Sequence, residues 1–292
     1  MNARDAELFE QARPRLLGLA YRMLGSRADA EDAVQDCFLK WSRADRAPIV
    51  EPAAWLTTVC TRRCLDLLRA ARRRRVDYVG SWLPEPLHAA TPDDGEAAGL
   101  ASTLTTAFLL MLERLSPKER AAYLLREIFD QPYPAIAATL AIDEAACRKL
   151  VSRARAHVDA GKARHHTPAE TQDRLLDAFH AAILSGSPEP LAELLSADIR
   201  LTADGGGKAS AILGVLEGQY RVLGFIRHAH KWWDGFDWTA ADINGARGAI
   251  LRRDGAPVLT LTFAYDAAGR IAHIFIMRNP DKLGRLGPAR IR

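Results

Sequence analysis

Arginines recur at helical spacing in the segment between residues 52 and 75. Arg62, Arg69 and Arg73 share one outward face of this predicted helix, and Arg63 flanks them. A guanidinium group is always charged and can form two parallel hydrogen bonds to a phosphate. The pattern therefore favours contact with a nucleic-acid backbone, although a solvated basic surface would show the same spacing.

A second group of polar residues is acidic and lies at the start of another predicted helix. Ser26 has the form of a helix cap, and the outer face of the following helix carries Glu31, Asp32, Gln35 and Asp36. Negative charge is favourable at the start of a helix because it complements the helix dipole. Taken alone, these residues are explained by a solvated acidic turn at the start of a helix.

A third group combines a tight turn with a basic helix. The sequence after Ser116 opens one helix, a short helix begins at Pro134, and Asp143 is placed to cap the next. The outer face of that last helix carries Arg148, Lys149, Ser152 and Arg153. A short helix, a small-residue turn and a basic second helix indicate a DNA-binding helix-turn-helix, which we favour over a purely structural helix pair.

The last third of the chain holds titratable residues in no catalytic spacing. The candidate general bases are Asp204, His228, His230, Asp234 and His273. His273 alternates with Ile271 and Phe275, as an inward-facing strand residue would. A histidine satisfied in the core or at its rim is the favoured interpretation. The pair Trp232 and Trp233 fits a core better than a ligand cavity.

The glycines after Asp204 suggest a phosphate loop but do not match one. The run Gly205, Gly206, Gly207 and Lys208 lacks the GxxxxGK[ST] spacing and follows no βαβ unit, so nucleotide binding is rejected. Glycine more plausibly serves here to allow a positive φ and close backbone approach. We predict no catalytic residue, metal or cofactor, and neither a CxxC pair nor a nearby histidine cluster suggests zinc.

Composition and patterning define the elements that must position these residues. The chain has 292 residues, 48% of them hydrophobic and 26% charged, with a formal net charge of +4. Helical periodicity covers residues 8–75, 102–158 and 168–195, and alternation of period two follows, with Leu259, Leu261, Phe263 and Tyr265 on one strand face. No apolar run is long enough to span a bilayer. The four cysteines fall at apolar helical positions and are expected to be buried and reduced.

With these blocks in view, the chain resembles the extracytoplasmic-function sigma factors of RNA polymerase. The segments that carry the resemblance are YRMLGSRADAEDAVQDCFLKW and WLTTVCTRRCLDLLR for region 2, and LSPKERAAYLLREIFDQPYPAIAATLAIDEAACRKLVSRARAHV for region 4. The motifs YVGSWLPEP, DGGGK and NPDKL, which begin at Tyr78, Asp204 and Asn279, are similar to those of a subgroup with an added SnoaL-like domain.

The resemblance implies three domains and their fold. Two would be all-α, a region 2 bundle at 1–78 and a region 4 helix-turn-helix at 102–164. A linker with the WLPEP motif would occupy 79–101, and an α+β SnoaL-like cone with a curved antiparallel sheet would occupy 165–283, followed by a basic tail at 284–292.

The resemblance also assigns partners to the residues identified above. Core polymerase would bind the acidic face at its β′ clamp, with the β flap meeting region 4. The −10 element would contact Arg62, Arg63, Arg69 and Arg73, and the −35 element would contact the basic helix. An asparagine is common in the family where Arg62 stands, which leaves the detailed −10 contacts open.

Regulation in cis is the role that the resemblance gives to the third domain. The residues expected to hold the linker and the domain together are Trp82, Leu83, Pro84, Asp204, Gly205, Gly206, Gly207, Asn279, Pro280 and Asp281. Trp82 and Leu83 would anchor the linker by burying apolar surface.

The expected function is therefore transcription initiation by a cytoplasmic, non-enzymatic protein that is monomeric when free and does not act at a membrane. A small-molecule ligand in the third domain is left open. The alternatives are a one-component regulator, against which the acidic docking face argues, and an isomerase or cyclase with DNA-binding extensions.

Overall fold

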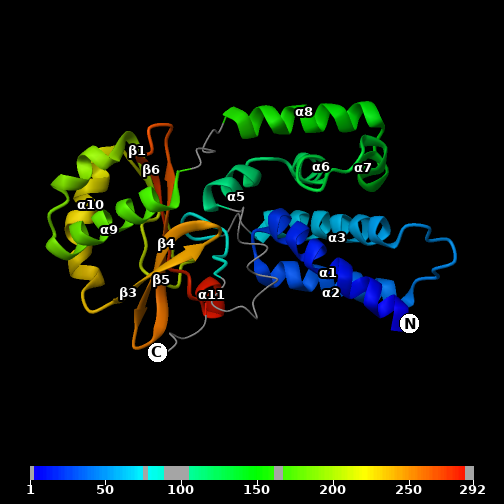
Figure 1. Cartoon of the computed structure of the whole chain (residues 1–292), viewed down its shortest axis with the longest axis horizontal. Helices are drawn as coiled ribbons and strands as arrows, with labels where there is room; N and C mark the ends of the chain where they lie inside the picture. The colour runs from blue at the N-terminus through cyan, green and yellow to red at the C-terminus, as the bar shows by residue number, and fades with distance from the viewer. Residues whose placement is uncertain (1–2, 75–77, 89–104, 161–166, 287–292) are drawn as a thin grey trace. The chain divides into compact units, whose positions relative to one another are not determined.

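The linker between the two helical regions packs with the C-terminal domain, not with the helices that flank it in the sequence. The computed structural model describes residues 3–74, 78–88, 105–160 and 167–286, with the backbone alone at 71–74 and 160 (Figure 1). One unit comprises Met1–Asp77 and Leu109–Lys162, and the other comprises Tyr78–Phe108 and Ala163–Arg292. The predicted linker from residue 89 onward and most of the predicted basic tail lie outside the described residues.

The first unit begins with three helices that pack on one another. They are α1 (Ala3–Leu24), α2 (Arg27–Arg43) and α3 (Pro52–Arg74). The Ser26 hydroxyl accepts a hydrogen bond from the Asp29 backbone N–H at 3.2 Å, which explains why α2 starts there. Trp41 of α2 is buried, and its indole N–H donates to the Asp5 carbonyl at 2.8 Å.

The predicted helix-turn-helix is present in the same unit. It follows α5 (Thr106–Glu113) and consists of α6 (Pro117–Glu127), α7 (Tyr133–Leu140) and α8 (Glu144–Ala160). Ser116 and Glu119 form a reciprocal capping box at the start of α6. Ala141 adopts the left-handed conformation, with φ 50°, and turns the chain into α8. The Asp143 carboxylate caps α8 by accepting from the Ala146 N–H at 2.7 Å.

The second unit is an α+β domain built on one six-stranded sheet. Its strands are β1 (Leu195–Asp204), β2 (Val215–Glu217), β3 (Asp237–Ile243), β4 (Ala246–Arg253), β5 (Ala256–Tyr265) and β6 (Ile271–Met277). Its helical elements are α9 (Ala169–Ser185), η3 (Glu189–Leu194), α10 (Gln219–Trp233), α11 (Pro280–Leu283) and η4 (Gly284–Leu286). The fold class predicted from the sequence is confirmed.

The sheet is mixed, so the expectation of a wholly antiparallel sheet is wrong in one pair. The strand order is β2-β1-β6-β5-β4-β3, and β1 pairs with β6 in parallel. Strands β3 to β6 form an antiparallel meander, whose hairpins leave local turn signals such as Asp254-Gly255. The pairing of the first strand with the last has no such local signal.

The helix predicted over residues 168–195 ends early. α9 stops at Ser185 because Gly186 takes the left-handed conformation, with φ 65°, as its C-cap. Pro188 follows, and the chain continues as the short 3-10 helix η3. The sequence signal, a glycine followed closely by a proline, was present in the predicted helix.

Both faces of the sheet are covered. Helices α9 and α10 lie together on one face (Figure 1), where the side chains at 259, 261, 263 and 265 are buried as predicted. A bulge opposite Ala264 and Tyr265 shifts the register of β6, so His273 does not share the face of Ile271. His273 instead lies on the other face beside Thr202, with 2.8 Å between Nε2 and Oγ1. His273 therefore does not point into the main core with Ile271, but it is half-buried and hydrogen-bonded, in agreement with a histidine satisfied at the rim of the core.

Candidate functional sites

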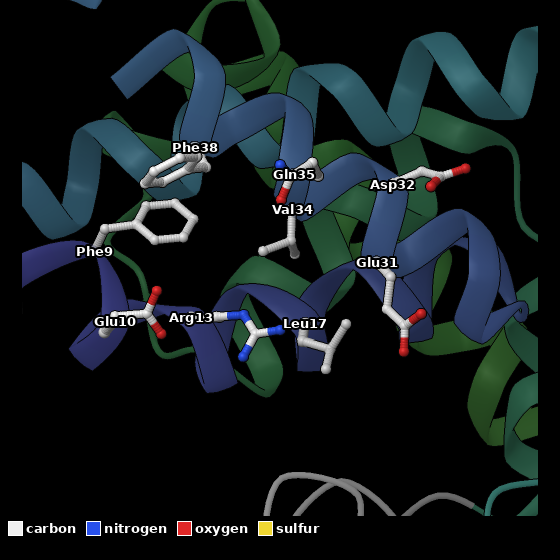
Figure 2. Close-up of a pocket in the computed structure, with 9 residues that line it drawn as sticks. All are labelled: Phe9, Glu10, Arg13, Leu17, Glu31, Asp32, Val34, Gln35 and Phe38. Carbon is white, nitrogen blue, oxygen red and sulfur yellow. The ribbon is translucent and has the colours of Figure 1, made fainter. Parts of the chain in front are cut away.

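A groove of about 370 Å³ runs between α1 and α2. Figure 2 shows Phe9 and Phe38 together at one end, with ring centroids 5.1 Å apart, and the carboxylates of Glu31 and Asp32 at the other. Gln35 also lines the groove. The lining also includes Glu10 and Arg13, so apolar side chains lie beneath a rim that is mostly acidic, which suits a basic, amphipathic partner. Three of the four residues predicted to bind polymerase are thus brought together.

The fourth predicted polymerase-binding residue faces α3 instead. The Asp36 carboxylate forms an ion pair with Arg63 at 2.6 Å, and both side chains are about one-third exposed. A residue predicted to bind polymerase and a residue predicted to bind DNA therefore neutralise each other. A partner that took either one would release the other.

The guanidinium group of Arg62 binds the end of α7 within the first unit. Its Nε donates to the Thr139 carbonyl and one terminal nitrogen donates to the Ala138 carbonyl, both at 3.0 Å. The hydroxyls of Thr58 and Thr139 are 3.0 Å apart at the same place. Cations are favoured here because the last carbonyls of a helix are unpaired and carry partial negative charge.

The other two residues predicted to bind the −10 element are Arg69 and Arg73. Arg69 is well exposed and pairs with Asp66 of its own helix at 3.1 Å. The side chain of Arg73 lies outside the described residues.

The residues predicted to read the −35 element all lie exposed on α8. Arg148 pairs with Glu144 one turn earlier, and Arg153 lies 3.2 Å from Glu119. The remaining two, Lys149 and Ser152, are also exposed. The opposite face of α8 is buried at Cys147, Val151, Ala154 and Val158 and half-buried at Leu150. The helix is thus amphipathic in the way that major-groove insertion requires.

The most elaborate polar site surrounds Asp204, whose side chain is fully buried at the end of β1. Its carboxylate accepts four hydrogen bonds. The donors are the Tyr78 hydroxyl at 2.6 Å, the Lys282 ammonium at 2.7 Å, and the backbone N–H groups of Leu83 at 2.8 Å and Gly206 at 3.0 Å. Four bonds use all the acceptor sites of a carboxylate. The residue joins three of the motifs noted in the sequence.

The partners of Asp204 are connected to one another. Lys282 also donates to the Leu83 carbonyl at 2.6 Å, and its ammonium lies 4.4 Å from the centre of the Trp82 ring system. The Asn279 amide donates to the Tyr78 hydroxyl at 2.9 Å. We call these residues the Asp204 cluster, with members Tyr78, Trp82, Leu83, Asp204, Gly206, Asn279 and Lys282. Burial and the hydrogen bond to Asp204 raise the pKa of Tyr78 above its usual value near 10.

The glycines of DGGGK allow close approach, as their sequence predicts. Gly206 has φ +58°, and a Cβ added there would lie 2.3 Å from the Asn279 amide nitrogen. A Cβ added at Gly205 would lie 2.2 Å from the Ala209 carbonyl oxygen. Gly207, with φ +71°, lies against Val79 of the linker. The loop is therefore shaped to contact the linker and the NPDKL segment.

The linker segment 78–88, which we call the linker strap, covers the sheet face opposite the helices. Leu83 and Leu87 are 1% and 2% exposed, and Pro84 is buried beside them. A cavity of about 10 Å³ lies between the strap and the sheet. At the far end Leu87 and Asn244 bind each other twice, through Leu87 N–H to Asn244 Oδ1 and Asn244 N–H to the Leu87 carbonyl, each at 2.9 Å.

The remaining predicted contacts are weaker than the cluster. Asn279 caps α11, with its Oδ1 accepting from the Asp281 N–H at 3.1 Å, and Pro280 is the first helical residue. Asp281 pairs with Lys208 at 2.6 Å, and both side chains are more than half exposed. Trp82 was expected to anchor the linker by burying apolar surface. It is half-buried, and its ring also contacts the Lys282 ammonium.

Sequence reasoning missed three residues of this site, Tyr78, Lys282 and Asn244. Tyr78 and Lys282 belong to the YVGSWLPEP and NPDKL motifs, so motif membership was the available signal. Asn244 stands before a glycine in the β3–β4 hairpin, with φ 51°. Its spacing indicates a turn, and nothing in the sequence indicates that its side chain also binds the linker strap.

The candidate acid–base residues do not converge on a site. His228 and His230 each contact a backbone carbonyl of their own helix α10, and His273 lies on the strap face. Trp233 is a core residue, whereas Trp232 is 53% exposed. Among the described residues, no three His, Cys, Asp or Glu side chains group as metal ligands would, and the four cysteines are buried and free.

Comparison with known proteins gives these sites their context. Residues 8–74 match the model of sigma-70 region 2, and residues 105–158 match that of sigma-70 region 4. These ranges contain the α1–α2 groove, the α3 arginines and the helix-turn-helix. Two helical domains of this kind define a sigma factor.

The similarity to individual sigma factors extends over the third domain. The chain is 35% identical to the extracytoplasmic-function sigma factor SigJ of Mycobacterium tuberculosis, over 94% of this chain and 91% of SigJ. It is 33% identical to the probable sigma factor SigI of the same organism, over 93% and 92% of the two chains. The crystal structure of SigJ superposes with a TM-score of 0.74 at 31% identity, covering 96% of this chain and 98% of that one.

The chain belongs to the extracytoplasmic-function sigma factors. As a member of this family it binds RNA polymerase core and promoter DNA and directs transcription initiation. The family consists of transcription regulators rather than enzymes. None of the described helices is both long and apolar enough to cross a membrane.

Proposed function

We propose that this sigma factor is regulated in cis, with the Asp204 cluster holding the linker strap on the third domain and so limiting promoter binding. The single observation that carries the proposal is the buried Asp204 carboxylate, whose four hydrogen bonds include two from the strap. The strap belongs to the polypeptide that joins region 2 to region 4. A site that fixes the strap therefore restricts both domains.

Chain length sets the frame for this restriction. Roughly 30 residues separate the end of α3 from α5, which at 3.3–3.6 Å per residue reach about 100 Å. The −10 and −35 elements are centred roughly 25 base pairs apart, about 85 Å along B-form DNA. A linker of this length lets region 2 and region 4 reach both elements, and a site that holds part of it on the third domain ties both regions to that domain.

The remaining assignments are parts of the same proposal. The α1–α2 groove, with Glu31, Asp32 and Gln35, would dock on the β′ clamp, and region 4 would meet the β flap. The −10 element would bind the α3 arginines, and the −35 element would bind α8 through Arg148, Lys149, Ser152 and Arg153. The protein would act in the cytoplasm, where polymerase is, and as a monomer when free.

The test is Asp204→Asn in the full-length chain. The amide keeps the shape but leaves Lys282 without its counter-charge, and breaking a buried pair costs about 3–5 kcal/mol. We expect promoter-specific transcription with core polymerase to increase, and hydrogen exchange at the Leu83 amide to accelerate. Asp281→Asn is the matched control, because an exposed pair contributes only about 0–1 kcal/mol. Faster exchange with unchanged transcription would show that strap release has no regulatory effect.

A further inference from the structure

One aromatic ring in the helix-turn-helix holds an arginine of the recognition helix. Tyr133 is the first residue of α7, and the guanidinium carbon of Arg148 lies 4.4 Å from the centre of its ring. The guanidinium of Arg126 lies 4.9 Å from the same centre. Stacking of this kind restrains a guanidinium plane, because the ring attracts the cation over its face.

A second contact fixes the other side of the same group. Arg148 pairs with Glu144, which lies one turn earlier on α8 and therefore on the same face. Both side chains are substantially exposed, with Arg148 at 60% and Glu144 at 41%. The arginine is thus held in a defined position while remaining open to a ligand.

This position is suited to reading DNA. In a helix-turn-helix the N-terminal residues of the second helix contact base edges while the first helix crosses the backbone. Glu144 and Arg148 lie in the first turns of α8, and Tyr133 lies at the start of α7. An arginine reads guanine by a bidentate bond to O6 and N7, which requires its planar fork to be correctly oriented.

We infer that Tyr133 is a positioning residue for promoter specificity, holding Arg148 ready to bind a guanine of the −35 element. Glu144 contributes to discrimination, because Arg148 must leave its ion pair with Glu144 to reach a base edge. Only a guanine, with O6 and N7, offers the two acceptors that offset the loss of this pair. The inference rests on the proposed placement of α8 at the −35 element.

The experiment uses the full-length chain with core polymerase on promoters randomised across the −35 element. Tyr133→Ala should reduce the preference for guanine at one position by on the order of tenfold, within the range that a bidentate contact provides. Arg148→Lys should reduce the preference at that same position. Tyr133→Phe keeps the aromatic ring and should therefore keep the base preference of the parent chain at every position.

The salt dependence of binding separates positioning from general affinity. Tyr133→Ala should leave the slope of log affinity against log salt unchanged, because no phosphate contact is lost. Lys149→Ala, on the same helix, should weaken binding to all sequences alike and reduce that slope by about 1.

Two results would overturn the inference in different ways. In the first, Arg148→Lys changes the base preference at one position, but Tyr133→Ala changes the preference at none or lowers transcription from all promoters equally. Tyr133 then does not position Arg148. If Arg148→Lys alters no position, the placement of Arg148 against the −35 bases fails as well. A Tyr133→Ala chain that unfolds leaves Tyr133→Phe and Arg148→Lys to decide, since a guanine preference unaffected by Arg148→Lys contradicts the inference by itself.

Discussion

At the scale of the residue, close packing around Gly206 leaves no space for a larger side chain. Gly206 has a positive φ, and a methyl group added there would lie 2.3 Å from the Asn279 amide nitrogen. Gly206→Ala should displace Asn279 and lower the free energy of unfolding by about 1–3 kcal/mol, from backbone strain and the lost bond to Tyr78. Denaturant unfolding measures this. Gly214→Ala is the control, since a Cβ there meets no atom within 4 Å, and equal effects of the two substitutions would contradict the account.

Tyr78 gives the Asp204 cluster a pH dependence. Its pKa is raised in the folded chain by burial and by the bond to Asp204. A group whose folded pKa is raised contributes stability that is complete below the unfolded pKa, about 10, and is lost as pH rises through the folded value. The parent chain should therefore be more stable than Tyr78→Phe at pH 8, by about 1 kcal/mol, and the difference should shrink above pH 10. Unfolding midpoints of both chains across this range provide the measurement, and a constant difference would rule out the titration of Tyr78.

At the scale of the element, the contact of Arg62 with α7 cannot persist on a promoter. Its guanidinium lies 3.0 Å from two carbonyls of region 4, whereas the two promoter elements are about 85 Å apart. Arg62→Ala should therefore widen the distribution of distances between spin labels on α3 and α8 in the free protein. Arg69→Ala is the control, because Arg69 pairs within its own helix. Identical distributions for all three chains would mean that Arg62 does not hold the two regions together.

The elements that sequence predicted well are those with local signals. Ser26 and Ser116 cap their helices through backbone groups three residues away, so their geometry is written in a few neighbouring positions. Gly186 ends α9, but the apolar periodicity continues on both sides of it and led to the prediction of one longer helix. The parallel pairing of β1 with β6 and the bulge near His273 depend on register between distant strands, which no local pattern specifies.

The candidate sites divide in the same way. The surface residues of α2 and α8 follow from helical spacing, because a helix fixes which side chains point outward. The Asp204 cluster joins residues as far apart as Tyr78 and Asn279. Motif resemblance grouped most of its members, but the central role of a single buried carboxylate emerged only from the fold. A carboxylate that is removed from water must be satisfied by protein hydrogen-bond donors, so Asp204 depends on its four partners. Its burial is a property of the assembled domain and cannot be read from the neighbouring sequence.

At the scale of the whole molecule, the linker strap completes the C-terminal domain. The strap buries Leu83 and Leu87 against a sheet face that also carries Thr260, Thr262, Phe275 and Met277. Without the strap this face would expose apolar surface, and Asp204 would keep its bonds from Lys282 and Gly206 but lose those from Tyr78 and Leu83. The linker of the sigma factor is therefore also a structural part of its third domain.

A domain that lacks this part should bind it when it is supplied separately. A chain of residues 167–286 should be marginally stable alone. A peptide of residues 78–88 should raise its melting temperature as the peptide concentration increases, with a gain in the free energy of unfolding of RT ln(1 + [L]/Kd). Thermal unfolding against peptide concentration measures the effect. A peptide with Leu83→Asp should not stabilise the domain, because it would bury a second carboxylate beside Asp204. If the two peptides raise the melting temperature equally, the strap is held by nonspecific apolar contact, and the Asp204 cluster does not determine where the linker binds.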